Sequence, residues 1–340
     1  MTTYQRLAAF SELRNRILNQ REPLDEIISA AHQRNSWFTP ENIRQAIFAN
    51  LNLLDQTNLE EWVSPYLAEL SEETDKNVGL ILAGNIPMVG FHDILTCLIA
   101  GFKVQIKTSS DDRVLIPYLL DQLIMIEPEF ASKIKIVDKL SNFDLVIATG
   151  SNNTSRYFDY YFRNVPHVIR KNRNGVSIIT SAESKEDFQK LGKDIFDYFG
   201  LGCRNVSKIF FPTDFDYSSF FEAIEGFSDI SNHYKYNNNY EYNKAIYLVN
   251  GDEHLDNGFL LLKRDERIAS PLGVVYIEEY QDIENVKERL VSDSKNIQCL
   301  VGNISLEGTV TTVPFGKSQE PKLSDYADGI NILEFLNANR

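Results

Sequence analysis

One cysteine lies in a setting that suits a nucleophile. Cys203 falls in the stretch FDYFGLGCRNVSKIFF (196–211), between a helical pattern and an apolar strand pattern, and Gly200 and Gly202 precede it. Glycines leave the backbone open to close approach by a ligand. A thiolate that attacks a carbonyl needs hydrogen-bond donors for the oxyanion that it forms. The stretch therefore predicts acyl-transfer chemistry, with the backbone N–H of Cys203 as one donor.

The stretch AGNIPMVG (83–90) offers a second donor. It follows the short apolar run VGLILA (78–83) and precedes a helical pattern. Open α/β sheets bind ligands at such strand-to-helix turns. Asn85 presents a side-chain amide there. The alternative is that Asn85 and Pro87 only shape the turn, and the turn taken alone favours that alternative.

Two further strand ends carry groups that suit a dinucleotide cofactor. VQIKTSS (104–110) places a lysine at the end of one apolar run, and IATGS (147–151) places a Thr-Gly-Ser at the end of another. Glycine and hydroxyl residues there suit a pyrophosphate, and a lysine suits an adenosine ribose or its phosphate. The fingerprint G-x-G-x-x-G does not occur. The candidate cofactor residues are Lys107, Thr149, Gly150 and Ser151.

The composition is that of a globular protein. The chain has 340 residues, of which 43% are hydrophobic and 24% charged, enough for one large or two medium cores. A net charge of −14 argues against binding to nucleic acid or anionic membranes. Cys97 and Cys299 lie among apolar residues and are expected to be core thiols. An odd cysteine count and an N-terminus without a signal-peptide core predict a cytoplasmic protein with no metal site.

Alternating strand and helix patterns predict two α/β domains. Residues 1–75 are expected to be helical, with Leu7, Phe10, Leu13 and Ile17 on one face. The strands expected in the first domain are 78–83, 102–107, 133–137, 143–148, 167–170 and 176–180. Those expected in the second are 208–211, 245–249, 259–263, 273–277 and 297–301. Such alternation indicates parallel sheets with helices on their faces.

The domain boundary is placed near residue 200. This gives a cofactor-binding domain at 76–200, a catalytic-cysteine domain at 201–318 and a tail at 319–340. The Asn/Tyr-rich stretch 231–244 is interpreted as a surface excursion, with a substrate-contacting loop as the alternative.

The order of these features resembles the aldehyde dehydrogenase superfamily, from about residue 77 to the C-terminus. An N-x-P turn, a strand ending in lysine, a Thr-Gly-Ser and a cysteine after a helix follow one another. Four stretches are similar to the acyl-CoA reductase branch, the LuxC-like fatty-acyl reductases of bacterial luminescence systems: AGNIPMVGFHD, PHVIRKNRNGVSI, KYNNNYEYNKAIYL and PFGKSQEPKLSDYADGINILEFL. The resemblance implies an α/β, aldehyde-dehydrogenase-like fold of two doubly wound domains with a helical N-terminal segment.

The resemblance also implies roles for single residues. Cys203 is the acylated nucleophile and Asn85 the oxyanion donor. Lys107 lies along the adenosine ribose and Ser151 near the pyrophosphate. Glu266 falls where the superfamily places a glutamate that holds the nicotinamide ribose, and Arg267 is the alternative occupant of that place.

One departure from the superfamily concerns the general base. IRKNRNG (169–175) stands where hydrolytic aldehyde dehydrogenases carry a glutamate, and it places Arg170 at that position. Activating water is difficult without a base, whereas a coenzyme A thiolate needs no such help. The departure favours thioester chemistry over oxidation to a free acid. Arg170, Lys171 and Arg173 form a basic patch, interpreted equally as a solvated strand edge or as a site for phosphates of the cofactor or coenzyme A.

A second departure concerns cofactor choice. Ser110 stands three residues after Lys107, where NAD-selective members often carry a glutamate that excludes a 2′-phosphate. NADPH is therefore expected, and NADH is the alternative if Asp111 and Asp112 turn inward.

The expected function is NADPH-dependent reduction of an acyl-CoA thioester to an aldehyde through a Cys203 acyl-enzyme. The alternatives are an NAD(P)-dependent aldehyde dehydrogenase and a catalytically silent cofactor-binding or scaffold protein. The resemblance further implies an acyl-protein synthetase as partner, an acyl-protein thioester as a second donor, and a homodimer.

Overall fold

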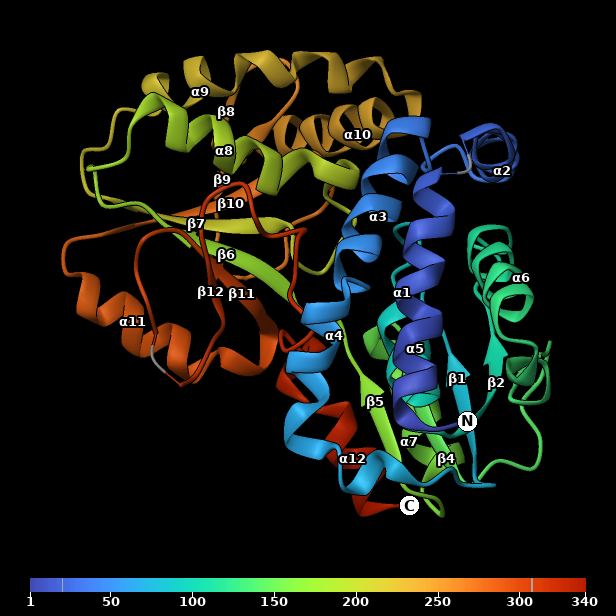
Figure 1. The fold of residues 1–340 in the computed structure, drawn as a ribbon. Coiled ribbons are helices and arrows are strands. Elements are labelled where there is room, and N and C mark those ends of the chain that lie inside the picture. Colours follow the sequence, from blue (N-terminus) through green and yellow to red (C-terminus); the bar gives the residue numbers. More distant parts are fainter. Residues whose placement is uncertain (20, 307) are drawn as a thin grey trace. The chain divides into compact units, whose positions relative to one another are not determined.

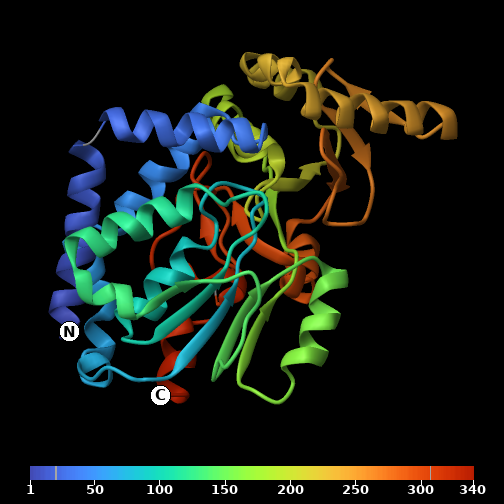
Figure 2. The same cartoon turned by 90° about the vertical axis from the view of Figure 1, so that its right-hand side faces the viewer.

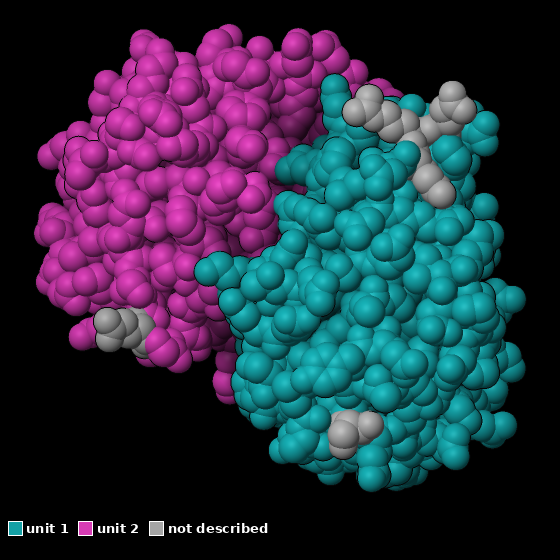
Figure 3. Space-filling view, viewed as in Figure 1, with its two compact units in different colours: residues 1–172, 322–340 teal, residues 173–321 magenta. Residues whose placement is uncertain are grey.

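The computed structural model describes residues 1–19, 21–306 and 308–340 (Figure 1). The chain forms two compact units, coloured separately in Figure 3: unit 1 holds residues 1–172 and 322–340, and unit 2 holds residues 173–321. This division differs from the predicted boundary near residue 200. The reason is that β6 (Asn174–Ile178) pairs with β7 (Val206–Pro212) and β11 (Ile297–Val301), and so belongs to the second sheet.

The N-terminal part of unit 1 is helical, as predicted. Its helices are α1 (Thr3–Asn19), α2 (Arg21–Arg34), α3 (Pro40–Leu53) and α4 (Gln56–Val63). The predicted apolar face of α1 is buried. Thr39 caps α3 by accepting a hydrogen bond from the Asn42 N–H at 3.2 Å. These helices share one hydrophobic core with the sheet of unit 1, so they do not form a separate segment.

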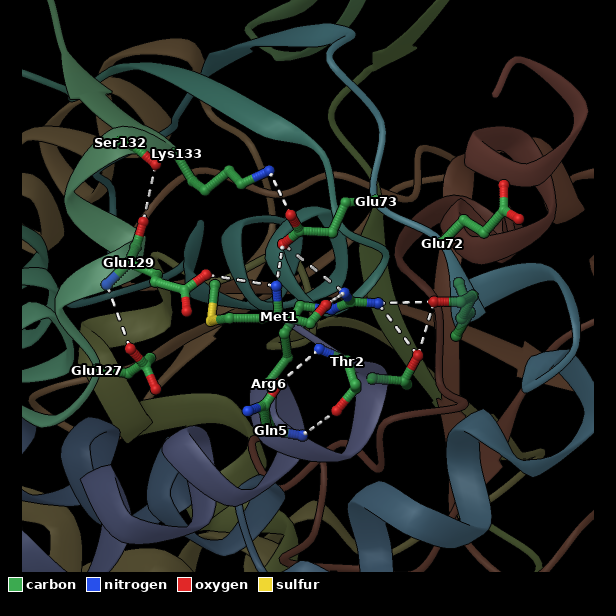
Figure 4. A network of polar contacts seen from close by, with 12 residues as sticks. Met1, Thr2, Gln5, Arg6, Glu72, Glu73, Glu127, Glu129, Ser132 and Lys133 are labelled. Atoms are coloured by element: carbon green, nitrogen blue, oxygen red, sulfur yellow. Dashed lines mark hydrogen bonds and ion pairs between the residues drawn. The ribbon is translucent and has the colours of Figure 1, made fainter.

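Arg6 ties α1 to the rest of unit 1 (Figure 4). Its buried guanidinium donates to the carbonyl oxygens of Ile99 at 2.8 Å and Leu70 at 2.7 Å. Glu73 lies 3.9 Å from this guanidinium and also pairs with Lys133 at 3.0 Å. These partners offset the cost of burying a charge, because a buried cation needs acceptors that replace water.

The sheet of unit 1 has five parallel strands in the order β3-β2-β1-β4-β5. They are β1 (Asn77–Ile81), β2 (Lys103–Lys107), β3 (Ile134–Ile136), β4 (Leu145–Thr149) and β5 (His167–Arg170). The helices between them are α5 (Phe91–Ile99), α6 (Leu115–Ile126) and α7 (Asn152–Phe162). Figure 2 shows α7 on the opposite face of this sheet from α1 and α6. The C-terminal helix α12 (Ile332–Ala338) packs against α5.

The sheet of unit 2 has seven strands in the order β12-β11-β6-β7-β10-β9-β8. The strands not yet given are β8 (His254–Asp256), β9 (Leu261–Arg264), β10 (Val274–Tyr280) and β12 (Thr312–Val313), and only β8 runs antiparallel to its described neighbour. Helices α8 (Lys185–Phe196), α9 (Tyr217–Ile224) and α10 (Tyr234–Asn250) lie on one face, and α11 (Ile283–Ser292) lies on the other (Figure 1).

Helix α10 corrects two predictions. Residues 245–249 are not a strand, and residues 231–244 are not a loop, because both belong largely to this single helix. Its buried side chains recur at helical spacing: Tyr236, Tyr240, Asn243 and Tyr247. The apolar side chains that suggested a strand include Leu248 and Val249, which are exposed.

The other expected strands are confirmed, with ends shifted by a few residues. Cys97 and Cys299 are buried core thiols, as expected. In the described ranges, we find no helix with the length and apolar character needed to cross a bilayer.

Candidate active site

The polar residues predicted at strand ends in unit 1 share one edge of its sheet. The strands are parallel, so their carboxyl ends point the same way. This edge carries the turn with Asn85 after β1, and then Lys107, Thr149 and Arg170 at the ends of β2, β4 and β5. The strand order reverses between β1 and β4, and open α/β sheets bind ligands at such a reversal.

The turn after β1 lies tightly against the segment after β2. A Cβ on Gly84 would lie 2.4 Å from the Cβ of Ser109, so a glycine is needed for this approach. Met88 has a φ of +59°, a left-handed conformation that costs free energy for a side chain of this size. Asp112 holds it there by accepting a hydrogen bond from the Met88 N–H at 2.7 Å. Asn85 is exposed within this turn.

Asp112 is a buried carboxylate with only 4% of its surface exposed. Burial raises its pKa to about 6, although the hydrogen bond from Met88 opposes the shift. Its other oxygen, Oδ1, has no hydrogen-bond partner in the part of the chain that the structure describes. The sequence leaves NADH as the alternative if Asp111 and Asp112 turn inward, and the structure directs the Asp112 carboxylate at the Met88 backbone.

The predicted cofactor residues differ in their surroundings. Lys107, at the end of β2, and Ser110, beyond it, are exposed. Ser151 is the N-cap of α7, and its hydroxyl accepts from the Thr154 N–H at 3.2 Å. A Cβ on Gly150 would lie 3.0 to 3.2 Å from the side chains of Phe158 and Thr154, so α7 begins close against the end of β4. This strand-to-helix junction suits a phosphate group.

The basic patch at 170–173 does not act as one group. Arg170 is buried and forms a bidentate ion pair with Asp93 on α5, with distances of 2.5 and 2.7 Å. This pairing argues against the predicted phosphate contact for Arg170. Lys171 is exposed and lies 3.9 Å from Asp159. Arg173 belongs to unit 2, where its guanidinium donates to backbone oxygens of residues 294 and 297.

Cys203 lies in unit 2, on the turn between α8 and β7. Three consecutive residues before it are left-handed: Tyr198 with φ +52°, Phe199 with φ +61° and Gly200 with φ +78°. Only the glycine adopts such angles without strain, and strained backbone gathers at functional turns. The Cys203 side chain is half-buried. We call residues 198–205, which carry the predicted nucleophile Cys203, the nucleophile turn.

Asn205 holds the nucleophile turn together. Its Oδ1 accepts from the Gly202 N–H at 2.8 Å. Its Nδ2 donates to the carbonyl oxygens of Asp194 at 3.0 Å and Asp197 at 2.9 Å, at the end of α8. A Cβ on Gly202 would lie 2.8 Å from Oδ1, so glycine is needed one residue before the cysteine.

A small cavity of about 40 Å³ borders part of the nucleophile turn within unit 2, and Cys203 is not among the residues that line it. Phe199, Gly200 and Asn205 line one side of it, and Tyr236 of α10 and residues 270–275 line others. Residues of β7 and β10 line the remaining sides of this cavity.

A second buried carboxylate lies below this turn. Asp194, on α8, is 1% exposed and accepts from the Gly316 N–H at 2.6 Å and the Ser318 N–H at 2.9 Å. Burial raises its pKa to about 6. The two hydrogen bonds fix the segment PFGKSQ (314–319). Gln319 at the end of this segment lies against Gly202. If Gly202 carried a Cβ, that atom would lie 3.4 Å from Oε1 and 3.5 Å from Nε2 of Gln319.

Glu266, the predicted ribose contact, is exposed in unit 2. Its carbonyl oxygen accepts from Arg289 at 2.5 Å. Arg267, the alternative occupant, is bound to the Asp265 carboxylate at 2.6 and 2.8 Å and stacks over Tyr276. The exposed carboxylate is therefore the better placed of the two to receive a ligand.

Sequence reasoning missed four residues near the candidate site, Asp93, Asp194, Asn205 and Gln319, and it considered Asp112 only for cofactor choice and not for its contact with Met88. Asn205 had a local signal, because an asparagine two residues after a cysteine in a glycine-rich turn is a common turn-former. The others act on partners far along the chain, so no local pattern indicates them.

Comparisons with known proteins agree with this architecture. A family model described as "Acyl-CoA reductase (LuxC)" matches residues 4–226, which include Asn85 and Cys203. A search of curated proteins found no match.

Solved structures of aldehyde dehydrogenases have a similar fold. Aldehyde dehydrogenase 21 from Physcomitrella patens, in complex with the reaction product succinate, is 14% identical, with 100% of this chain and 84% of that chain covered and a TM-score of 0.72. The NAD+ complex of a Bacillus cereus aldehyde dehydrogenase is 15% identical (92% and 76% covered, TM-score 0.67). A Mycobacterium tuberculosis aldehyde dehydrogenase complexed with NAD+ is 12% identical (92% and 77% covered, TM-score 0.67).

At these identities the structures establish the expected aldehyde-dehydrogenase-like α/β fold with its helical N-terminal segment. The family model goes further, because it matches more than half of the 340 residues. The chain belongs to the acyl-CoA reductase (LuxC) family and is thereby an oxidoreductase that acts on acyl or aldehyde groups.

Proposed function

We propose that this protein reduces acyl-CoA thioesters to aldehydes with NADPH, through an acyl group held on Cys203. The observation that carries the proposal is the position of this thiol. It lies within the residues that match the family, half-buried on a strained, glycine-containing turn. Such a turn exposes a nucleophile and its backbone N–H together.

The edge of the unit 1 sheet fits a dinucleotide cofactor. Gly150 and the N-terminus of α7 form the junction that suits a pyrophosphate. Lys107 at the end of β2 and Ser110 beyond it are exposed, and Asp112 is directed at Met88, which favours room for a 2′-phosphate. Asp111, which follows Ser110, is also exposed, and NADH remains the alternative if it faces the cofactor. These residues would hold the adenosine half, and Glu266 would hold the nicotinamide ribose. When bound, the cofactor supplies a hydride to the acyl carbon.

The residues of the chain perform the acyl transfer. The Cys203 thiolate forms a bond to the thioester carbon, and the carbonyl electron pair moves to oxygen. The proposed donors to this oxyanion are the Cys203 N–H and the Asn85 amide. The pair then returns, the bond to the sulfur of coenzyme A breaks, and the acyl group remains on Cys203. After reduction, collapse of the Cys203 thiohemiacetal releases the aldehyde and restores the thiolate.

The surroundings of Arg170 support thioester reduction over hydrolysis. Its guanidinium is buried and paired with Asp93, so the position predicted to replace the general base carries a neutralised cation. A cation cannot accept a proton from water. The acyl-enzyme would therefore be long-lived enough to await reduction.

The first experiment follows NADPH oxidation and aldehyde release with a panel of acyl-CoA thioesters. Wild-type protein should form aldehyde, and Cys203→Ala should form none, while Cys97→Ala serves as a control for loss of a buried thiol outside the turn. If the wild-type protein releases no thiol and forms no aldehyde with any chain length, coenzyme A donors are wrong. An acyl-protein thioester, supplied by an acyl-protein synthetase, is then the donor to test.

A second experiment addresses cofactor choice. Lys107→Ala should raise the KM for NADPH by about tenfold, equivalent to about 1.4 kcal/mol, and should change the KM for NADH less. Lys135→Ala, an exposed lysine on β3, is the matched control. Equal effects on both cofactors would assign Lys107 to the ribose and not to a 2′-phosphate.

A further inference from the structure

Gln319 places an unused hydrogen-bond donor beside the nucleophile turn. Its Nε2 atom is buried and has no partner within residues 1–19, 21–306 and 308–340. This atom lies 3.5 Å from the position that a Cβ on Gly202 would take, one residue before Cys203. A buried donor without an acceptor costs roughly 1–3 kcal/mol, so such a group usually has a function.

The position of Gln319 is fixed by its neighbours. Asp194 holds the N–H groups of Gly316 and Ser318, which lie three residues and one residue before it. Glu320, which follows it, pairs with Lys317 at the surface. The pair with Lys317 is local to the segment, so Asp194 is the contact that ties the segment to α8, and the amide meets the nucleophile turn at Gly202.

The nucleophile turn does not itself use this donor. The oxygen and nitrogen of the Asn205 side chain are engaged with Gly202 and with the end of α8. A purely structural glutamine would be expected to bond through its nitrogen to one of the nearby backbone oxygens. Its nitrogen instead has no acceptor among the residues that the structure describes.

We propose that Gln319 is a catalytic residue that donates a hydrogen bond from Nε2 to the acyl carbonyl oxygen during attack by Cys203. This inference rests on the proposed acylation of Cys203. The carbonyl oxygen is nearly neutral in the thioester and gains a negative charge as the sulfur–carbon bond forms. A donor fixed in advance stabilises that charge more than it stabilises the bound substrate, and so accelerates the step. Gln319 belongs to the same unit as the nucleophile, and therefore acts with the Cys203 N–H.

The test measures acylation alone. Wild-type protein is mixed with an acyl-CoA without any nicotinamide cofactor, and the single-turnover release of coenzyme A thiol is followed. Gln319→Met keeps an unbranched side chain of similar length and removes the donor. It should slow thiol release by about a hundredfold, the effect of removing one oxyanion donor. Gln281→Met, at an exposed glutamine of unit 2, is the matched control and should not slow it.

A second reaction separates a donor from a structural role. Iodoacetamide alkylates Cys203 by displacing iodide, so no oxyanion forms at the reacting carbon. Gln319→Met should therefore be alkylated at the wild-type rate. If alkylation and thiol release slow together, Gln319 only shapes the turn, and the proposal is overturned. Should Gln319→Met fail to fold, Gln319→Glu keeps the shape without the amide donor and should show the same slow release.

Different results would overturn the role of Gln319 and the proposed acylation of Cys203. Thiol release at the wild-type rate in Gln319→Met would overturn the role of Gln319 and leave the proposed function intact. No thiol release from the wild-type protein, with normal alkylation of Cys203, would overturn acylation by coenzyme A thioesters and the role of Gln319 with it.

Discussion

Each of the two units carries one turn of the candidate site, and the two turns are held in different ways. In unit 1 the turn with Asn85 is fixed by Asp112, a carboxylate 24 residues from the backbone N–H of Met88 that it binds. In unit 2 the nucleophile turn is packed against a segment fixed by Asp194, whose partners Gly316 and Ser318 are 122 and 124 residues away. Both carboxylates are buried, and both have a pKa raised to about 6.

This difference shows how much each turn depends on parts of the chain far from it in sequence. Asp112 spans adjacent strand ends of a parallel sheet, so the fold of that sheet almost suffices to place it. Asp194 joins a helix to a segment from near the end of unit 2, so its turn is assembled only when distant parts of the chain have come together. Unit 2 should accordingly be the more sensitive to changes at its carboxylate.

The largest expected effect is on the pH dependence of the free energy of unfolding. It should be the same for Asp112 in unit 1 and for Asp194 in unit 2. Each aspartate has a pKa of about 6 when folded against an ordinary value of 3.8, so the folded state binds its proton more tightly. The protonated aspartate contributes fully to the free energy of unfolding below about pH 4, and this contribution is lost as the pH rises through about 6. A shift of this size is worth about 3 kcal/mol.

Asp112→Asn and Asp194→Asn each remove one such titration. Relative to wild type, the free energy of unfolding of either variant should rise by about 3 kcal/mol from pH 4 to pH 7, measured by urea denaturation. Asp138→Asn, at an exposed aspartate, is the control. A difference that stays flat across this range would mean that the replaced aspartate ionises normally despite its burial.

The next effect should separate the two units. Asparagine keeps one acceptor oxygen, which suffices for the 2.7 Å hydrogen bond that residue 112 accepts from the Met88 N–H. At residue 194 both oxygens accept, so the new NH₂ would face a backbone N–H of Gly316 or Ser318. At any one pH, Asp194→Asn should therefore be less stable relative to wild type than Asp112→Asn, by about 2 kcal/mol.

Hydrogen exchange locates this loss. The amides of Gly316 and Ser318 should exchange faster in Asp194→Asn, whereas the Met88 amide should keep its protection in Asp112→Asn. Equal costs at the two positions would show that the number of accepted hydrogen bonds does not decide the difference between the units.

The same contrast explains what the sequence could predict. The strand ends of unit 1 were placed correctly because continuous apolar runs mark buried parallel strands, and parallel strands bring their carboxyl ends to one edge. The residues at that edge follow from this rule alone. The glycine-flanked cysteine was likewise visible as a local pattern.

What could not be predicted depends on distant partners. Helix α10 was not predicted because its buried face consists of tyrosines and an asparagine. Some of their polar atoms bond to backbone oxygens far along the chain. Tyr236 donates to Phe259 at 2.9 Å and Asn243 to Leu272 at 3.0 Å. The roles of Asp194 and Gln319 were not predicted either, because both side chains contact residues far along the chain. No pattern within a window of the sequence shows that a carboxylate on α8 fixes a segment more than a hundred residues later.

The smallest expected effect tests whether the two turns are independent. Gly84→Ala should destabilise unit 1, because its Cβ would lie 2.4 Å from the Cβ of Ser109, and Ser109→Gly removes the atom that it meets. The double variant should recover about 1 kcal/mol relative to the sum of the single changes. Gly202→Ala meets Asn205 Oδ1 at 2.8 Å instead, so its cost should simply add to that of Ser109→Gly. Denaturation of the two double-mutant cycles measures both couplings. A coupling energy between Ser109 and Gly202 as large as that between Ser109 and Gly84 would contradict this expectation. It would mean that a change in one turn alters the stability of the other, so that the two turns are not independent.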